Sequence, residues 1–310
     1  MILVHSARYQ VDIGAHVFPM GKYALVREAL LARALATPED FVEPDPATWD
    51  ELALVHAPEY LEKTRAGGFR SSELALLEMP WSADVAEGFR LMTGGTITAG
   101  RLAMAAARAQ APGAQARPLV AAVNIGGGFH HAFPSHGEGF CLYNDVAVAI
   151  RTLQRDGTIA GAAVVDVDVH QGNGTAFTFE GDPSVFTFSI HQDANYPCIK
   201  PRGSLDVGLP DGADDHDYLR ALERALPIVL ASGPDLLFYV AGADPYLEDQ
   251  LGGLNLTFEG LRGRDFAVLS AARAAGVPVV VVLAGGYARR AEDTAAIHVA
   301  TIEEAIRLGA

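Results

Sequence analysis

The chain has 310 residues, half of them apolar, and a formal net charge of −15. This length suits one large domain with its own core, and the acidic balance disfavours nucleic acid as the main partner because phosphate binding needs a basic face. The two cysteines, Cys141 and Cys198, provide no disulfide framework. The sequence shows no signal peptide or membrane span, so we expect a cytoplasmic protein. The sequence does not define its oligomeric state.

Strand and helix patterns alternate along the chain. Short apolar runs, each soon followed by Gly, Asn, Asp or His, predict parallel strands buried on both faces. In chain order we expect a helix over Thr93–Arg108, a strand over Leu119–Val123, a helix over Leu142–Arg155, strands over Ala162–Val167 and Val185–Ile190, a helix over Asp215–Leu230, a strand over Leu236–Val240, a helix over Phe258–Ala275, a strand over Val279–Leu283 and a helix over Asp293–Leu308. This succession predicts a single α/β domain over residues 1–310, with a mostly parallel central sheet flanked by helices. The active site of such a sheet lies beyond the carboxyl ends of its strands.

The segment Ala162–Thr175 reads AAVVDVDVHQGNGT and ends an apolar run with polar side chains. Asp166, Asp168 and His170 alternate with valines, so on a strand all three would project from one face. Two carboxylates and an imidazole are costly to bury unpaired, and a cation removes that cost. Such side chains are the usual ligands of a catalytic zinc, which keeps one position open. The segment therefore predicts a metal site rather than the solvent-exposed face of an edge strand.

The glycine-rich segment Asn124–Asp145 reads NIGGGFHHAFPSHGEGFCLYND and follows the expected strand Leu119–Val123. Its glycines, Gly128 among them, allow tight turns near a ligand. His130 and His131 cannot share one face of a regular strand, but a loop of this kind can direct both into one cavity. The pair offers a general base and a general acid, or metal ligands. Taken alone, it is equally consistent with two ordinary loop histidines.

Two later strands also end close to reactive side chains. Asp244 follows the expected strand Leu236–Val240, where its carboxylate can complete an Asp/His/Asp metal site or can cap a turn beside Pro245. Tyr287 follows the strand Val279–Leu283 and two glycines. A phenol at that point can donate a hydrogen bond to a developing oxyanion, or can be an ordinary aromatic side chain at the rim of the sheet.

These segments, together with SIHQ at Ser189–Gln192, occur in the order of the motifs of the histone deacetylase family, which the chain resembles over most of its length. The resemblance implies the arginase-deacetylase fold and zinc-dependent hydrolysis of the amide bond of an N-acyl amine. It implies a single zinc held by Asp168, His170 and Asp244. His131 is then the general base beside the attacking water, and Tyr287 is the oxyanion donor.

The resemblance also implies supporting and substrate-binding roles. His130 is the other histidine of the catalytic pair, and Asp166 faces it as a supporting carboxylate. A potassium ion is implied close by, around Asp166, Asp168, His170, Ser189 and Ile190. A second, outer potassium site is implied at Phe179, Asp182 and Val185. Substrate contacts are expected at Gly128, Phe140, Tyr196 and Leu251, with the two aromatic rings enclosing the stem of an acylated lysine side chain or of a small acylated amine.

Two positions set this chain apart within the family. Asn173 stands behind His131, where some relatives place Asp, and the HQGN sequence resembles bacterial and class four members. Since a neutral amide stabilises an imidazolium less than a carboxylate does, we hypothesise that His131 passes through a less stabilised charged form. The pH–rate profiles of the wild type and of Asn173→Asp test this. Leu251 lies where polyamine-selective relatives carry Glu, which weighs against an acetylpolyamine substrate.

Three alternative functions stay open at this point. An acetylpolyamine amidohydrolase shares the same chemistry. A binuclear manganese ureohydrolase shares the fold, but it needs additional carboxylate ligands for its second metal ion. This chain has Gln171 after His170 and Pro245 after Asp244, and neither side chain is a carboxylate. A non-catalytic acyl-binding relative keeps the pocket without the reaction, although every expected catalytic group is present in this chain.

Overall fold

The centre of the fold is an eight-stranded sheet in which neighbouring strands are all parallel. The computed structural model describes residues 1–110 and 118–310, and within them the strand order is β2-β1-β3-β8-β7-β4-β5-β6. The strands are β1 (Ile2–Val4), β2 (Phe41–Val42), β3 (Ala121–Asn124), β4 (Ala162–Asp166), β5 (Val185–Gln192), β6 (Leu205–Leu209), β7 (Leu236–Val240) and β8 (Val279–Val282). The expected α/β fold with a parallel sheet is confirmed.

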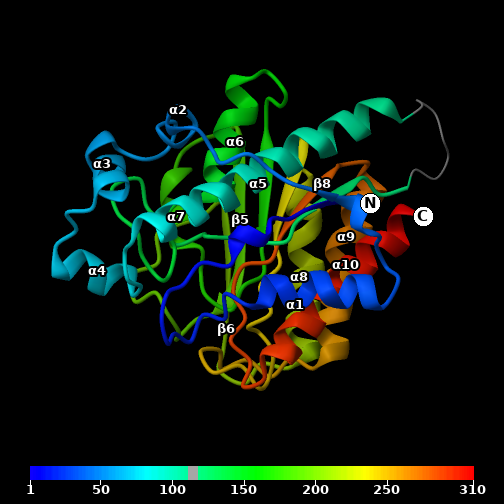
Figure 1. Cartoon of the computed structure of the whole chain (residues 1–310). Helices are drawn as coiled ribbons and strands as arrows, with labels where there is room; N and C mark the ends of the chain where they lie inside the picture. Colours follow the sequence, from blue (N-terminus) through cyan, green and yellow to red (C-terminus); the bar gives the residue numbers. More distant parts are fainter. Residues whose placement is uncertain (111–117) are drawn as a thin grey trace.

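Helices cover both faces of this sheet (Figure 1). α5 and α6 pack together on one face, and α1, α8, α9 and α10 form a layer on the other. The helices are α1 (Lys22–Ala32), α2 (Trp49–Leu52), α3 (Pro58–Ala66), α4 (Ser71–Leu77), α5 (Ala83–Ala109), α6 (Asp145–Arg155), α7 (Asn173–Thr178), α8 (Asp215–Leu230), α9 (Phe258–Ala275) and α10 (Ala291–Gly309). None of these helices is long and apolar enough to cross a membrane.

The five expected strands are all present, each within two residues of its expected bounds. Every residue of β3, β4, β7 and β8 is buried, which explains their continuous apolar sequences. α8 and α9 also match the expected bounds, because capping residues fix where they begin. The Asp214 side chain accepts hydrogen bonds from the first turn of α8, and the Thr257 side chain accepts one from the backbone N–H of Gly260 in α9.

The sequence patterns missed β1, β2 and β6, as well as the shorter helices and α1. β1 and β2 have only three and two residues, and β6 is partly exposed along most of its length. The expected helix over Thr93–Arg108 is the second part of α5, which begins ten residues earlier. At Gly94 a side-chain Cβ would lie 1.9 Å from the carbonyl oxygen of Asp45. Glycine therefore lets α5 pack directly against backbone there, although it weakens the helical pattern.

Candidate active site

Four adjacent strands carry the candidate site. β3, β8, β7 and β4 are consecutive neighbours in the sheet. The loops that follow them hold His130 and His131 after β3, Tyr287 after β8, Asp244 after β7, and Asp168 with His170 after β4. Parallel strands end at one edge of a sheet, so residues far apart in the sequence meet there.

The metal-binding segment itself is a loop rather than a strand. β4 ends at Asp166, so the expectation that Asp166, Asp168 and His170 alternate along one regular strand was wrong. The Asp166 carboxylate accepts a hydrogen bond from the backbone N–H of Asp168 at 3.1 Å, and the Asp168 carboxylate accepts one from the N–H of His170 at 3.0 Å. Asp side chains that bond the backbone two residues onward favour turns over strands.

Asp168, His170 and Asp244 form a buried group whose ligand atoms all lie within 4.8 Å of one another. The His170 Nδ1 atom lies 3.0 Å from Asp168 Oδ1 and 3.4 Å from Asp244 Oδ2. Asp244 Oδ2 is buried and has no hydrogen-bond partner, so a ligand atom is free at this point. The one other such group in the described part of the chain is exposed. It comprises Asp214, His216 and Asp217, at the start of α8.

The electrostatics of this buried group favour positive charge. Burial raises the pKa of the Asp244 carboxyl to about 7, and the neighbouring Asp168 carboxylate adds to the effect. Burial opposes a charge on His170, but the hydrogen bond with Asp168 and the attraction of both carboxylates outweigh this and raise the pKa of the imidazole to about 10. Two carboxylates and one imidazole, with one oxygen unpartnered, fit a divalent metal ion that accepts nitrogen and oxygen ligands.

Glycine is required beside these carboxylates. A Cβ at Gly285 would lie 2.0 Å from Asp244 Oδ2 and 2.5 Å from Asp168 Oδ2. The backbone N–H of Gly285 instead donates a hydrogen bond to Asp168 Oδ2 at 2.9 Å. The loop after β8 thus approaches the group closely and holds one of its ligands.

The two histidines have different partners and therefore different charge states. His130 Nδ1 lies 2.6 Å from Asp166 Oδ2, whereas His131 Nδ1 lies 2.7 Å from Asn173 Oδ1. Burial alone would lower the pKa of His130, but the carboxylates of Asp166 and Asp168 raise it to about 9. The pKa of His131 lies well below its usual value because of burial and of the neighbouring His130 and His170. His131 is thus neutral and able to accept a proton.

Asp145, at the start of α6, anchors the loop that bears this pair. Its carboxylate accepts hydrogen bonds from the backbone N–H groups of Gly128, at 3.0 Å, and Phe129, at 2.7 Å, and from the Thr96 hydroxyl at 2.5 Å. No role for Asp145 could be predicted from the sequence, because its partners are backbone groups and a threonine 49 positions away. Gly128 itself, expected to contact substrate, is buried with φ of +85° and does not line the channel described below.

Replacing Asp145 with Ala is expected to lower the free energy of unfolding by about 1–3 kcal/mol, because buried N–H groups lose their acceptor. Urea denaturation measures the change. Asp156→Ala is the matched control, since its carboxylate pairs with Arg101 and Arg155 at the surface and should cost less than about 1 kcal/mol. Equal losses in the two variants would contradict the anchoring role.

Asp249 and Gln250 fix the position of Tyr287. The backbone N–H of Tyr287 donates to Asp249 Oδ2 at 2.6 Å, and the Gln250 side-chain amide donates to the Tyr287 carbonyl at 2.8 Å. Burial raises the pKa of the Tyr287 phenol well above its usual value, with help from Asp168 and Asp244. The hydroxyl therefore stays protonated and able to donate a hydrogen bond beside the carboxylate group.

A channel of about 160 Å³ leads to these residues. It is lined by Glu78, His131, Gly139, Phe140, His170, Asn195, Tyr196, Leu251 and Tyr287. The Phe140 ring lies edge-on to Tyr287, with centroids 5.9 Å apart, and Tyr196 lies edge-on to His131 at 5.0 Å. Three of the four expected substrate contacts thus line it, and it is also lined by three residues that no sequence motif predicted, Glu78, Gly139 and Asn195.

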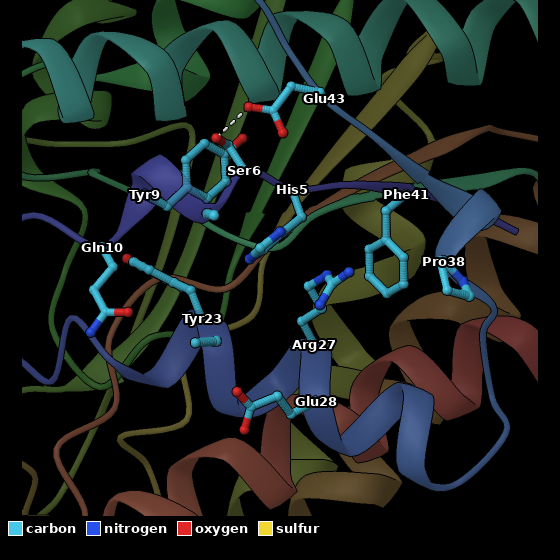
Figure 2. A pocket seen from close by; sticks show the side chains of 12 residues that line it. His5, Ser6, Tyr9, Gln10, Tyr23, Arg27, Glu28, Pro38, Phe41 and Glu43 are labelled. Atoms are coloured by element: carbon cyan, nitrogen blue, oxygen red, sulfur yellow. Dashed lines mark hydrogen bonds between the residues drawn. The ribbon is translucent and has the colours of Figure 1, made fainter.

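A larger cavity, of about 430 Å³, lies elsewhere, at the carboxyl ends of β1 and β2 (Figure 2). His5, Tyr9, Arg27 and Glu28 are among its lining residues. Burial and the nearby Arg27 lower the pKa of His5 to about 4. The Arg27 guanidinium lies over the Phe41 ring, 5.1 Å from its centroid. Among the described residues, no group that could bind a metal ion lies at this larger cavity. The smaller channel is therefore the candidate active site.

Several of the expected potassium ligands have partners within the protein. Ser189 of β5 is the register partner of Asp166, and its hydroxyl lies 2.9 Å from His191 Nδ1. At the expected outer site, Asp182 forms an ion pair with Arg151 at 2.7 Å, and the same guanidinium lies 4.8 Å from the centroid of the Phe179 ring. An arginine cation therefore already occupies the neighbourhood of the outer site.

The chain is similar to known proteins over most of its length. The histone deacetylase domain model matches residues 16–302. An uncharacterized protein of Picosynechococcus sp. is 42% identical over 91% of this chain and 90% of its own length. Histone deacetylase 2 of Arabidopsis thaliana is 29% identical over 99% of this chain and 79% of its own length. The acetoin utilization protein AcuC of Bacillus subtilis is 30% identical over 83% and 69%.

Solved structures agree with this grouping. An HDAC homolog complexed with SAHA superposes with a TM-score of 0.81 at 25% identity, covering 99% of this chain and 84% of that one. The HDA15 HD domain superposes with a TM-score of 0.79 at 24% identity, covering 99% and 88%, which supports the fold. Since the histone deacetylase domain model spans nearly the whole sequence, this chain belongs to the histone deacetylase family.

Proposed function

We propose that this protein is a zinc-dependent deacylase that hydrolyses the amide bond of an N-acyl amine. The observation that carries the proposal is the buried group of Asp168, His170 and Asp244. It lies at a channel that also holds a neutral histidine and a protonated phenol. Membership of the deacetylase family supports the same chemistry.

Asp168, His170 and Asp244 would hold the zinc ion. They provide three ligands, which is the number typical of a catalytic site with one open position. A zinc ion bound there supplies Lewis acidity toward the amide carbonyl and toward a water molecule. Gln171, the next side chain, donates to the carbonyl of Pro201 and to Asp206, and the described residues form no second buried cluster of metal-ligating side chains.

His131 moves the proton in the proposed reaction. Its Nδ1 faces the oxygen of Asn173 and therefore carries the hydrogen, which leaves Nε2 with a free electron pair. Nε2 accepts a proton from water while the new carbon–oxygen bond forms, and it returns the proton to the amine nitrogen as the carbon–nitrogen bond breaks. His130 is bonded to Asp166, and its pKa is raised to about 9 despite burial, so His131 is better suited to act as this base. The Tyr287 hydroxyl donates to the carbonyl oxygen as negative charge develops on it.

The channel favours a long apolar stem with the amide at its end. Phe140 and Tyr196 provide the aromatic walls, as an acyl-lysine or a small acylated amine requires. Leu251 lines the same channel and has no charge to pair with a second ammonium, which disfavours acetylpolyamines. The similar HDAC homolog binds SAHA, and we propose that this chain also accepts a ligand in its channel. A potassium ion near Asp166 and Ser189, and a cytoplasmic location, belong to the same proposal.

The test is an acyl-substrate panel with the purified zinc-loaded chain. The panel contains acetyl-lysine and longer acyl-lysine peptides, acetylpolyamines and small acetylated amines. We expect hydrolysis of acyl-lysine or small acylated amines, loss of activity with a chelator, recovery with zinc, and a single zinc per chain. Binding without hydrolysis would instead identify a non-catalytic relative, and two manganese ions per chain would identify a ureohydrolase.

A further inference from the structure

One carboxylate next to the candidate site has no role in the reaction described above. The Glu138 side chain is only 12% exposed. Its Oε1 atom accepts hydrogen bonds from the Asn173 amide at 2.7 Å and from the Tyr196 hydroxyl at 2.8 Å. Its Oε2 atom lies 3.3 Å from His136 Nε2. Glu138 thus joins the residue behind the general base to an aromatic wall of the channel.

The contact with Asn173 determines which way the amide faces. A carboxylate accepts hydrogen bonds and cannot donate them, so the amide nitrogen of Asn173 must point to Glu138. The amide oxygen then points to His131 Nδ1 and also accepts the backbone N–H of Gly174 at 3.0 Å. An oxygen beside Nδ1 requires a hydrogen on Nδ1 and therefore leaves Nε2 unprotonated.

Glu138 is ionised in this position. Burial on its own would raise the pKa of the carboxyl, but the hydrogen bonds from His136, Tyr196 and Asn173 outweigh burial and lower it. The chain lacks the Asp that stands directly behind this histidine in some relatives. A negative charge is nevertheless present, one amide group further away.

We propose that Glu138 is the positioning carboxylate of the general base in this protein. Acting through Asn173, it holds His131 with Nε2 free toward the channel, and it supplies the charge that Asn173 lacks. The same oxygen fixes Tyr196, so the base and the channel wall share one anchor. This inference rests on the proposed function.

An exchange of charge between the two positions tests the proposal. Glu138→Gln keeps a hydrogen-bond acceptor but removes the charge, and kcat is expected to fall about 10–100-fold, the usual loss for a residue that orients a catalytic group. Asn173→Asp alone places two carboxylates in hydrogen-bond contact and should also lower kcat about 10-fold or more. The double variant restores one carboxylate with an amide partner. The kcat of the double variant is expected to be at least about ten-fold higher than that of Asn173→Asp alone, because the effects of substitutions at contacting residues are not additive.

His136→Gln is the matched control, because it alters the longer contact, to the other oxygen of the same carboxylate. Its kcat is expected to stay close to that of the wild type. The hydrogen bond from the Tyr196 hydroxyl becomes weaker when its acceptor is neutral, which loosens the channel wall and should raise KM in Glu138→Gln, separately from kcat. The proposal is overturned if Glu138→Gln retains the wild-type kcat, or if the double variant is no better than the worse single variant.

A second readout does not depend on turnover. In the zinc-loaded chain labelled with ¹⁵N-histidine, NMR should show His131 protonated at Nδ1 in the wild type and a mixture of tautomers in Glu138→Ala. If the panel of acylated substrates fails while this tautomer change is seen, the proposed function is wrong but the positioning role stands. An unchanged tautomer in a folded Glu138→Ala variant with normal kcat contradicts the positioning role alone.

Discussion

Replacing His131 with Gln is expected to lower kcat by about 10²–10⁴-fold, the usual contribution of a positioned general base. The glutamine amide cannot take up the proton that the proposed reaction releases from water. His131 is buried and its pKa is lowered, so it is the histidine of the pair that is free to accept this proton. Steady-state kinetics on the best substrate of the panel measure the change.

Two control measurements show whether His131→Gln affects the base alone. Metal content should stay at the wild-type level, because His131 is not among the three residues of the metal group. The thermal unfolding midpoint should also remain close to that of the wild type. A decrease in kcat of less than about ten-fold, well below the range for general bases, would assign the base to another residue.

Tyr287→Phe is expected to lower kcat by about 10²–10³-fold, as removal of one oxyanion donor usually does. The phenylalanine ring retains the edge-on contacts with Phe140 and Phe18, so the channel keeps its shape. The change removes only the hydroxyl, which burial and the carboxylates keep protonated. Zinc should still bind with the wild-type stoichiometry.

The matched control for Tyr287→Phe is Tyr246→Phe. The Tyr246 ring packs on Phe258, with centroids 4.8 Å apart, and does not line the channel. This variant should turn over substrate like the wild type. Normal kcat in Tyr287→Phe would mean that the oxyanion is stabilised by other groups, whereas loss of zinc would mean that the hydroxyl supports the metal group.

Elements with strong local signals could be predicted from the sequence. β7 lies in the middle of the sheet and is buried throughout, so its apolar run marks both of its ends. α8 and α9 begin at capping side chains that the sequence displays. β6 is defined by pairing with β5 rather than by its own composition. The first part of α5 contains Gly88, where a Cβ would lie 2.3 Å from Val11 Cγ1, and this glycine weakens the helical pattern of that part.

The same distinction applies to the candidate site. Asp168, His170, Asp244 and the histidine pair follow strand ends in recognisable motifs, so their meeting could be anticipated. Asp249 and Glu138 act on Tyr287 and Asn173 through contacts that bridge 38 and 35 positions of the chain. Such contacts depend on how loops fold over one another, and no spacing in the sequence encodes them. The alternation of Asp166, Asp168 and His170 was misread because side-chain-to-backbone bonds end the strand early.

The strand order has a consequence for how the protein is made. β8 is the last strand along the chain, yet it lies between β3 and β7 in the middle of the sheet. Until the ribosome has released the segment around residues 279–282, β3 and β7 each have an open edge, and open edges invite wrong pairing. Tyr287 also arrives with this segment. A nascent chain therefore cannot assemble the complete candidate site before its last strand is in place, so synthesis and the onset of activity are coupled.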